Sequence, residues 1–258
     1  MKFKNTLVIL LLIMLFIVSC QNSSSTSSLV SSDTSSFVSS QTSDEKISKV
    51  GLYSAPEGVS IAKDVTMQIN GESVDLYEVM VNNSQRWNGL APDRIPNYVA
   101  IIQLEGRATI EVKTEYELNY NTVIRPLYYN ILPFTDIKNQ TFTFEIFNVG
   151  SYVIEINGDR SNVIHLFVKS FEDDYTSLKN EENVIYFGPG LHNSSNNNLI
   201  KNNTVEIKSN QTVVIDYGAV VQARFVSHHT SNISLIGGGI IDGSVFSRIA
   251  GQPSGNTQ

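Results

Sequence analysis

A short β-branched run closed by glycine occurs three times in the second half of this chain, at residues 184–188, 213–218 and 233–237. Such runs, bounded by Asn and Gly and separated by tens of residues, predict strands that stack coil upon coil in a β-solenoid. Each coil buries its inward face only against its neighbours, so about three coils and end caps are needed for stability. Because the chain stops at Gln258, soon after Gly243, we expect the solenoid to be incomplete.

The first twenty residues have the layout of an export signal. Lys2 and Lys4 precede an unbroken apolar run over residues 7–18, and Ser19 and Cys20 follow it, as in a secretory signal peptide. The run is shorter than the ~20 residues needed to span a bilayer. Residues 17–20 resemble the lipobox of bacterial lipoproteins, which implies that Cys20 is lipidated. An ordinary signal with an incidental cysteine, or an uncleaved anchor, is the alternative.

Cys20 is the only cysteine, so an internal disulfide is impossible. A diacylglyceryl group would hold the protein firmly, because two acyl chains anchor far better than one. We therefore expect an exported protein that is lipid-anchored to the bacterial cell membrane and extracytoplasmic. Residues 21–48 follow as a Ser-rich stretch, whose composition predicts a disordered tether.

The net charge of the chain is −7, from 25 acidic and 18 basic residues. An acidic balance argues against nucleic acid as a partner, because its recognition needs a basic footprint. A polyanionic substrate stays compatible with the charge, since a local basic groove can exist on an acidic protein. We expect a polysaccharide partner, a membrane contact through the lipid anchor, a monomer, no cofactor and no metal ion.

Residues 49–170 carry short alternating segments with turn residues between them, which predicts an all-β domain. Residues 65–69 and 74–76 flank Asn70-Gly71, the signature of a type I′ hairpin. We predict further strands at six places, and the whole as a two-sheet sandwich with a small barrel as the alternative. These strands are residues 98–104, 108–112, 123–125, 141–147, 152–156 and 165–168.

The second half is divided by its composition. Residues 171–182 are rich in Asp, Glu and Lys and are predicted to be a connector. Residues 183–258 form the start of the solenoid, in which residues 193–203, rich in Asn and Ser, are predicted to be a loop. Residues 204–207 are predicted to form an extra strand.

Three stretches of the solenoid segment resemble a known enzyme family. Residues 184–192 (VIYFGPGLH), 216–221 (DYGAVV) and 237–243 (GGGIIDG) are similar to the opening coils of the polygalacturonase-type glycoside hydrolases and their dextranase and isopullulanase relatives. Upstream, residues 123–127 and 153–159 resemble the β-sandwich that precedes the helix in bacterial members. The resemblance implies an all-β fold, with a β-sandwich followed by the first coils of a right-handed parallel β-helix of the pectate-lyase-like kind, here truncated.

The family's catalytic aspartates lie on middle coils, downstream of the Ile-Asp-Gly turn, and no part of this chain matches their motifs. Inverting glycosidases need two carboxyl groups ~6.5–9.5 Å apart. We therefore assign no catalytic residue. Asp242 lies between Ile241 and Gly243, and we interpret it as a corner residue that bonds nearby backbone while glycine takes a strained φ.

Other candidate residues have structural alternatives. The acid pairs at residues 173–174 and 181–182 could hold calcium or act as acid and base, but adjacent residues on a strand point to opposite faces. The histidine pair at residues 228–229 could supply one metal ligand, but His165 and His192 are not placed by sequence to join it. We expect solvated charges and an exposed loop instead.

Three further side chains could contact a sugar. Arg125 and Arg160 could bind acidic sugars, but we expect each to pair with a carboxylate or to cover apolar surface. Trp87 lies in a polar loop and could be a sugar-stacking platform or could pack onto the sandwich. The sequence therefore leaves the substrate-binding residues unknown.

The resemblance implies the N-terminal part of a surface-anchored, polysaccharide-degrading glycoside hydrolase. It would be polygalacturonase-like, acting on pectic or related glycans, with its catalytic coils missing from this chain, so the sequence leaves open whether the chain is itself an enzyme. One alternative is a non-catalytic surface lipoprotein that binds glycan through the sandwich. Another is an inactive product of a truncated gene, whose open coil end would expose apolar faces.

Overall fold

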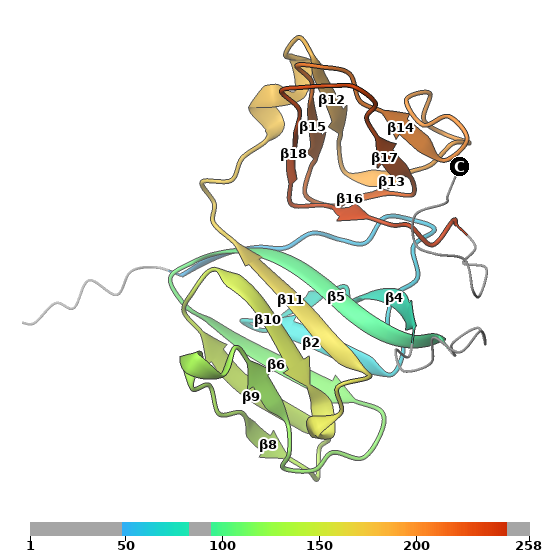
Figure 1. Cartoon of the computed structure of the whole chain (residues 1–258). Helices are drawn as coiled ribbons and strands as arrows, with labels where there is room; N and C mark the ends of the chain where they lie inside the picture. Colours follow the sequence, from blue (N-terminus) through green and yellow to red (C-terminus); the bar gives the residue numbers. More distant parts are fainter. Residues whose placement is uncertain (1–47, 83–93, 247–258) are drawn as a thin grey trace, which may run out of the picture. The chain divides into compact units, whose positions relative to one another are not determined.

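In the part of the chain that the structure describes, the regular structure is β-strand, with a few turns of 3-10 helix (Figure 1). A computed structural model describes residues 48–82 and 94–246 of the chain. Two sheets occupy residues 49–169, which we call the two-sheet domain, and stacked parallel strands occupy residues 184–241, which we call the coil region. The 3-10 helices are η1 (Leu127–Tyr129), η2 (Ile156–Gly158) and η3 (Thr176–Asn180). None of the helices in the described ranges has the length and apolarity needed to cross a membrane.

The first sheet has six strands in the order β1-β5-β11-β10-β7, with β4 also paired to β5. Its pairs are antiparallel except for β11 on β5, which is parallel. The strands are β1 (Lys49–Gly51), β4 (Tyr77–Asn82), β5 (Arg94–Glu105), β7 (Val123–Arg125), β10 (Gly150–Glu155) and β11 (Val163–Lys169).

The second sheet has five antiparallel strands in the order β3-β2-β6-β9-β8. They are β2 (Val65–Ile69), β3 (Glu72–Val74), β6 (Ala108–Thr114), β8 (Phe134–Asp136) and β9 (Thr141–Ile146). The predicted hairpin is confirmed, because Asn70 (φ 51°) and Gly71 (φ 83°) join β2 to β3. Positive φ at both positions is what a type I′ turn requires.

Residues of the two sheets share one hydrophobic core. On β6 the side chains alternate between buried and exposed along the whole strand, and β2 alternates in the same way. Isoleucines from both sheets are fully buried in this core, among them Ile102, Ile110, Ile146, Ile154 and Ile164. Alternation with period two therefore defines the inward faces of β2 and β6.

The strands of the coil region stack in parallel, one coil on the next. β12 (Val184–Phe187), β15 (Thr212–Ile215) and β18 (Ser234–Gly237) form one ladder. A second ladder is formed by β13 (Gly190–His192), β16 (Ala219–Val221) and β19 (Ile240–Ile241), and β14 (Thr204–Glu206) pairs with β17 (Arg224–Val226). The three repeated runs thus lie beside one another, as predicted.

A separate hydrophobic cluster fills the coil region. Phe187, Val213 and Val221 are fully buried in it, and Ile200 from the Asn-rich loop joins them. The Phe187 ring meets the Phe225 ring edge to face, with ring centroids 6.1 Å apart. β-branched residues on short parallel strands therefore build the interior of the stack, as expected for strands covered by neighbouring coils.

Three consecutive glycines, residues 237–239, form the corner between β18 and β19 because the second coil leaves no room there for side chains. A Cβ at Gly237 would overlap the backbone of Ile215, and one at Gly238 would overlap the Tyr217 ring. A Cβ at Gly239 would lie 2.5 Å from the carbonyl oxygen of Asp216. The glycine run is therefore a packing requirement of the stacked turns, and Gly237 also has a φ of 139° that L-residues rarely adopt.

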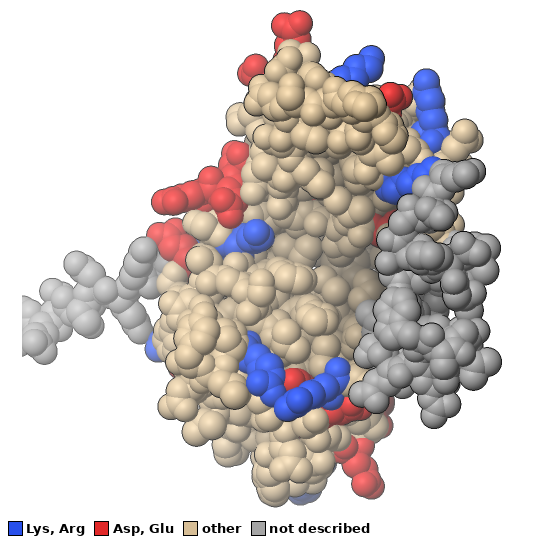
Figure 2. All heavy atoms as spheres, in the orientation of Figure 1, with Lys and Arg blue, Asp and Glu red and all other residues tan. Residues whose placement is uncertain are grey.

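Charged side chains are dispersed on the face of the protein drawn in Figure 2. Lys and Arg side chains lie in small groups there, acidic side chains lie near several of them, and uncharged side chains make up most of the remaining described surface. The visible described surface on this face carries no continuous basic patch. Uncharged surface of this kind is where a neutral ligand would meet the least desolvation cost.

Candidate functional site

Arg125 and Arg160 both turn toward one buried carboxylate. The Nε and Nη2 of Arg125 donate to the two carboxylate oxygens of Glu155, at 2.6 and 3.1 Å. Arg160 Nε lies 3.8 Å from Oε1 of the same residue, whose side chain is only 7 % exposed. The bond to Glu155 raises the pKa of the Arg125 guanidinium above its ordinary value. The expectation that both arginines pair with carboxylate is confirmed.

Replacing Arg125 by alanine should destabilise the two-sheet domain, because Glu155 would lose its bidentate partner while staying buried. We expect the melting temperature to fall by on the order of 5 °C. Arg160→Ala is the matched control, since Arg160 is 78 % exposed and more distant, and surface pairs contribute little. Melting is monitored by circular dichroism. Equal decreases in the melting temperatures of the two variants would show that the bidentate pair contributes no more to stability than the exposed one.

Two acidic side chains of the coil region, Asp216 and Asp242, are engaged in turns. Asp216 is buried, and it accepts hydrogen bonds from the Tyr186 hydroxyl and from the backbone N–H of Tyr217 at 2.8 Å. Burial, followed by the bond to Asp216, raises the pKa of Tyr186. Glu206 is exposed on β14. We assign no catalytic role to any of the carboxylates described between residues 184 and 246.

Asp242 occupies the corner after β19, as predicted. Its carboxylate accepts the backbone N–H of Ser244 at 2.8 Å and the Nε2 amide of Gln222 at 3.0 Å. The glycine part of the prediction is wrong, because Gly243 has no positive φ and Gly237 has one instead. The strained backbone of this motif lies at the start of the turn, where the second coil is closest.

The acidic pairs of the connector are residues 173–174 and 181–182, on either side of η3. Asp174 is exposed and accepts the backbone N–H of Thr176 at 2.9 Å, which lowers its pKa. Glu181 and Glu182 are both exposed. Their arrangement is that of solvated charges around η3, in agreement with the expectation from the sequence.

The histidines are scattered over the described chain. His228 and His229 are exposed in the loop after β17, whereas burial lowers the pKa of His165 on β11. His192 contacts the carbonyl oxygen of Gly188 at 2.7 Å through Nε2. Within residues 48–82 and 94–246, no group of three or more His, Cys, Asp or Glu side chains could hold a metal ion. Cys20 and Trp87, two further sites of interest, lie outside the described residues.

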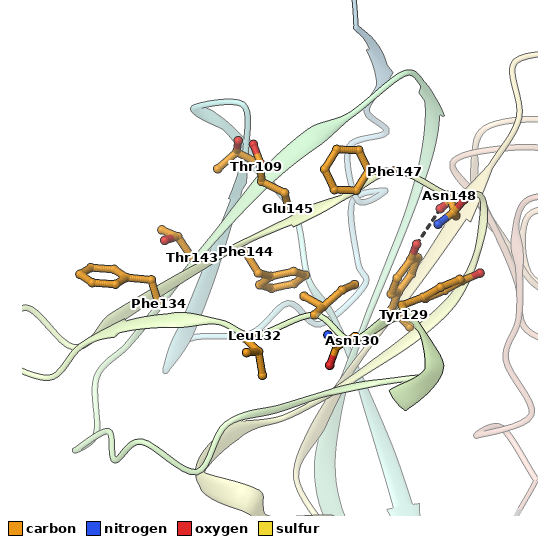
Figure 3. A pocket seen from close by; sticks show the side chains of 12 residues that line it. Thr109, Tyr129, Asn130, Leu132, Phe134, Thr143, Phe144, Glu145, Phe147 and Asn148 are labelled. Atoms are coloured by element: carbon orange, nitrogen blue, oxygen red, sulfur yellow. Dashed lines mark hydrogen bonds between the residues drawn. The ribbon is translucent and has the colours of Figure 1, made fainter. Parts of the chain in front are cut away.

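The described chain contains a pocket on the two-sheet domain that the sequence did not indicate. It has a volume of about 390 Å³, which falls in the range of small-molecule sites, ≈ 300–1,000 Å³. Part of its lining comes from residues 129–132, in the connection from β7 to β8, and from Phe134 on β8. The rest comes from Thr109 on β6, residues 143–145 on β9, Phe147, Asn148 and Tyr152 (Figure 3). We call this pocket the aromatic groove.

The groove forms where the chain crosses from one sheet to the other. β7 is an edge strand of the first sheet and β8 an edge strand of the second, and the link between them turns through η1. Asn130 ends η1 in the left-handed conformation, with φ 51°, which asparagine tolerates better than most residues. The pair between Arg125 and Glu155 holds the β7 end of this link.

Aromatic and polar side chains alternate around the groove. In Figure 3 the rings of Phe134, Phe144 and Tyr129 follow one another across the site, with Phe147 to one side. Tyr152 is buried, which raises its pKa to about 12, and its hydroxyl donates to the carbonyl oxygen of Asn148 at 2.8 Å. Cross-strand pairing sets Thr109 opposite Glu145 and Phe134 opposite Thr143. The sheet register therefore brings rings and hydrogen-bonding groups to one place.

Residues 127–134 (LYYNILPF) held the only sequence signal for this groove. A run so rich in apolar and aromatic residues is normally taken as core. Here Tyr128 is 78 %, Leu132 83 % and Phe134 74 % exposed. Exposure depends on what the run packs against, so the local pattern could not reveal it.

Comparison with known proteins identifies the fold. No family model and no curated protein sequence matches the chain. Among solved structures the chain is similar to Dex49A from Penicillium minioluteum, a dextranase with a parallel β-helix, with a TM-score of 0.53 and 14 % sequence identity. The match covers 75 % of this chain and 48 % of Dex49A, so the chain spans about half the length of that structure. At this identity the likeness shows the fold alone: this chain has an all-β fold like that of a parallel β-helix glycoside hydrolase.

Proposed function

We propose that this chain is the N-terminal part of an exported glycoside hydrolase that degrades polysaccharide. In this proposal the two-sheet domain is the β-sandwich expected from the sequence, and the coil region begins a right-handed parallel β-helix. The substrate is a pectic or related glycan by the polygalacturonase-like sequence motifs, or a neutral glucan by analogy with the dextranase fold. Both are polysaccharides, and the test below separates them.

One observation carries this proposal. The repeated runs form parallel ladders in register, with Val184 beside Thr212 and Thr212 beside Ser234, on the same chain as a two-sheet domain. The similarity to Dex49A extends over 75 % of the chain. A stack of this kind is a scaffold on which further coils add binding and catalytic groups.

The exposed surface of the third coil fits the addition of further coils. Leu235 on β18 is 50 % exposed and Ile241 on β19 is 43 % exposed. A following coil would cover these apolar side chains, as the third coil covers the second. Hydrolysis by inversion would then use one carboxylic acid to protonate the leaving oxygen and one carboxylate to activate water. The described coils supply neither group to this scheme.

The hydrolase proposal is tested on the protein isolated from its producing cells. Its intact mass is measured, and it is incubated separately with dextran and with polygalacturonate. We expect new reducing ends from one of the two polymers, with inversion of anomeric configuration in the proton NMR spectrum of the first product. If neither polymer, nor any of a panel of plant and bacterial glycans, is cleaved, the hydrolase proposal is rejected.

The aromatic groove favours a second candidate function, a surface lipoprotein that binds glycan without cleaving it. The groove lies wholly on the two-sheet domain, so binding there does not depend on the coil region for a contact. Glycan binding by the isolated protein without any cleavage would favour this candidate over the hydrolase.

We also propose that the protein is tethered to the outer face of the cell membrane through Cys20. Support comes from the apolar run, the lipobox-like residues and the absence of any other cysteine. Cells grown with radiolabelled palmitate should yield labelled protein in the membrane fraction, and Cys20→Ala should abolish the label and release the protein, because the acyl chains provide the anchor. Ser19→Ala keeps the cysteine and serves as the control. If Cys20→Ala carries no label but stays in the membrane fraction as fully as the unchanged protein, the proposal is contradicted.

A further inference from the structure

The aromatic groove has no part in the hydrolytic chemistry proposed above. It lies between an edge strand, a crossing link and the turn after β9, and none of these elements belongs to the coil region. A groove with rings and convergent polar groups is the usual form of a ligand site. The rings, hydrogen-bonding groups and charge of its lining indicate which class of ligand it would bind.

Exposed rings give the groove its apolar contacts. Phe134 is 74 % exposed and Phe147 is 57 % exposed, although both are large and apolar. The face of an aromatic ring is electron-rich and attracts the slightly positive hydrogens of C–H bonds. A pyranose ring presents several such bonds on one face, so a sugar can stack on either phenylalanine.

Polar side chains around the rings are available to a ligand. Within the described residues, no hydrogen bond or ion pair engages the side chains of Asn130, Thr143 or Glu145. Asparagine both donates and accepts, a threonine hydroxyl does the same, and an ionised glutamate accepts. Sugar hydroxyls donate and accept as well, so these three side chains match them.

The charge of the lining decides between neutral and acidic sugars. Glu145 is the one lining residue that carries a charge near neutral pH. The lining includes no lysine, arginine or histidine. A uronic acid in this groove would bring its carboxylate toward that of Glu145 without a cation to pair with. A neutral sugar would meet no such repulsion.

We infer that the aromatic groove binds a short stretch of a neutral polysaccharide, stacking sugar rings on Phe134 and Phe147 and bonding hydroxyls through Asn130, Thr143 and Glu145. This inference deepens the proposed function, on which it rests for the class of ligand. The groove holds the polymer on the two-sheet domain and thereby keeps it at the protein that acts on it. A second copy of the chain is the other occupant that the test distinguishes.

Isothermal titration calorimetry on the purified full chain tests the inference. The probes are dextran oligosaccharides and polygalacturonate oligosaccharides of equal length. We expect the dextran probe to bind and the polygalacturonate probe to bind at least about tenfold more weakly. Phe134→Ala and Glu145→Ala should each weaken dextran binding by about tenfold, because each removes one contact that the bound sugar makes.

Tyr120→Ala is the matched control for the aromatic change. Tyr120 is 77 % exposed and does not line the groove, so its loss should leave dextran binding unchanged. Circular dichroism of each variant verifies the fold, which should be retained because Phe134 and Glu145 are exposed. Equal dextran affinity in Phe134→Ala and the unchanged protein would overturn the inference.

Two other outcomes also overturn it. One is tighter binding of polygalacturonate that weakens with added salt, since that would indicate a cationic site. The other is concentration-dependent dimerisation in sedimentation velocity that Phe134→Ala abolishes, since the groove would then bind a second copy. Failure of dextran to bind while the isolated protein still cleaves polysaccharide rejects the groove and leaves the hydrolase. Binding that depends on Phe134 without any cleavage retains the groove and rejects the hydrolase.

Discussion

Replacing Gly237 by alanine is expected to detach the third coil from the second. The new Cβ would overlap the backbone of Ile215, to which Gly237 is paired across the ladder. No rotation of a side chain can relieve an overlap with backbone, and the φ of 139° adds strain for any L-residue. Together these effects should cost about 3 kcal/mol or more of local stability.

Hydrogen exchange measured by mass spectrometry locates this effect. Peptides covering β15 and β18 should lose protection in Gly237→Ala, because the bond from the Gly239 N–H to the Ile215 carbonyl, 2.9 Å long, would be broken. Gly243→Ala is the control in the same motif, since a Cβ there would have no atom within 4 Å. We expect that change to stay within about 0.5 kcal/mol. Similar exchange in both variants would show that the coils do not stack as described.

Replacing Phe187 by alanine is the second change with a large expected effect. Phe187 is fully buried at the centre of the coil cluster. Its ring packs edge to face on Phe225, with the centroids 6.1 Å apart, and on His192, with the centroids 5.4 Å apart. Truncation leaves a cavity among short strands that cannot collapse without breaking the ladders, so the free energy of unfolding should fall by about 3–5 kcal/mol.

Urea unfolding followed by circular dichroism measures this loss. Tyr120→Ala again provides the aromatic control, because a side chain that is 77 % exposed contributes little burial, and its effect should stay below about 1 kcal/mol. A loss below about 1 kcal/mol in Phe187→Ala would mean that the coil cluster is not close-packed. Hydrogen exchange of Phe187→Ala tests whether the two domains unfold together. If the strands of the two-sheet domain keep their protection, the two hydrophobic clusters unfold separately.

Local alternation was sufficient to predict many strands of the two-sheet domain. β7 matches its prediction at Val123–Arg125, and β9 and β11 differ from theirs by at most two residues at either end. β1, β4 and β8 were missed. β1 and β8 have three residues each, too few for an alternating pattern to stand out, and β4 follows the predicted hairpin so closely that no turn signal separates them.

Sequence alone determined which three runs form the ladder β12-β15-β18 of the coil region. The three glycine-closed runs, the Asn-Gly hairpin and the pairing tendency of Arg125 follow from rules of backbone conformation and charge that act over a few residues. These rules do not depend on what lies across the fold.

Tertiary structure decided which apolar side chains stay outside. The run at residues 127–134 has the composition of a core strand, yet the link between the sheets leaves Leu132 and Phe134 exposed in the lining of a pocket. Glu145 and Thr109 join that pocket only through the pairing of β6 with β9. Exposure and proximity depend on contacts between residues far apart in the chain. A local sequence pattern therefore does not show whether another segment will cover an apolar side chain.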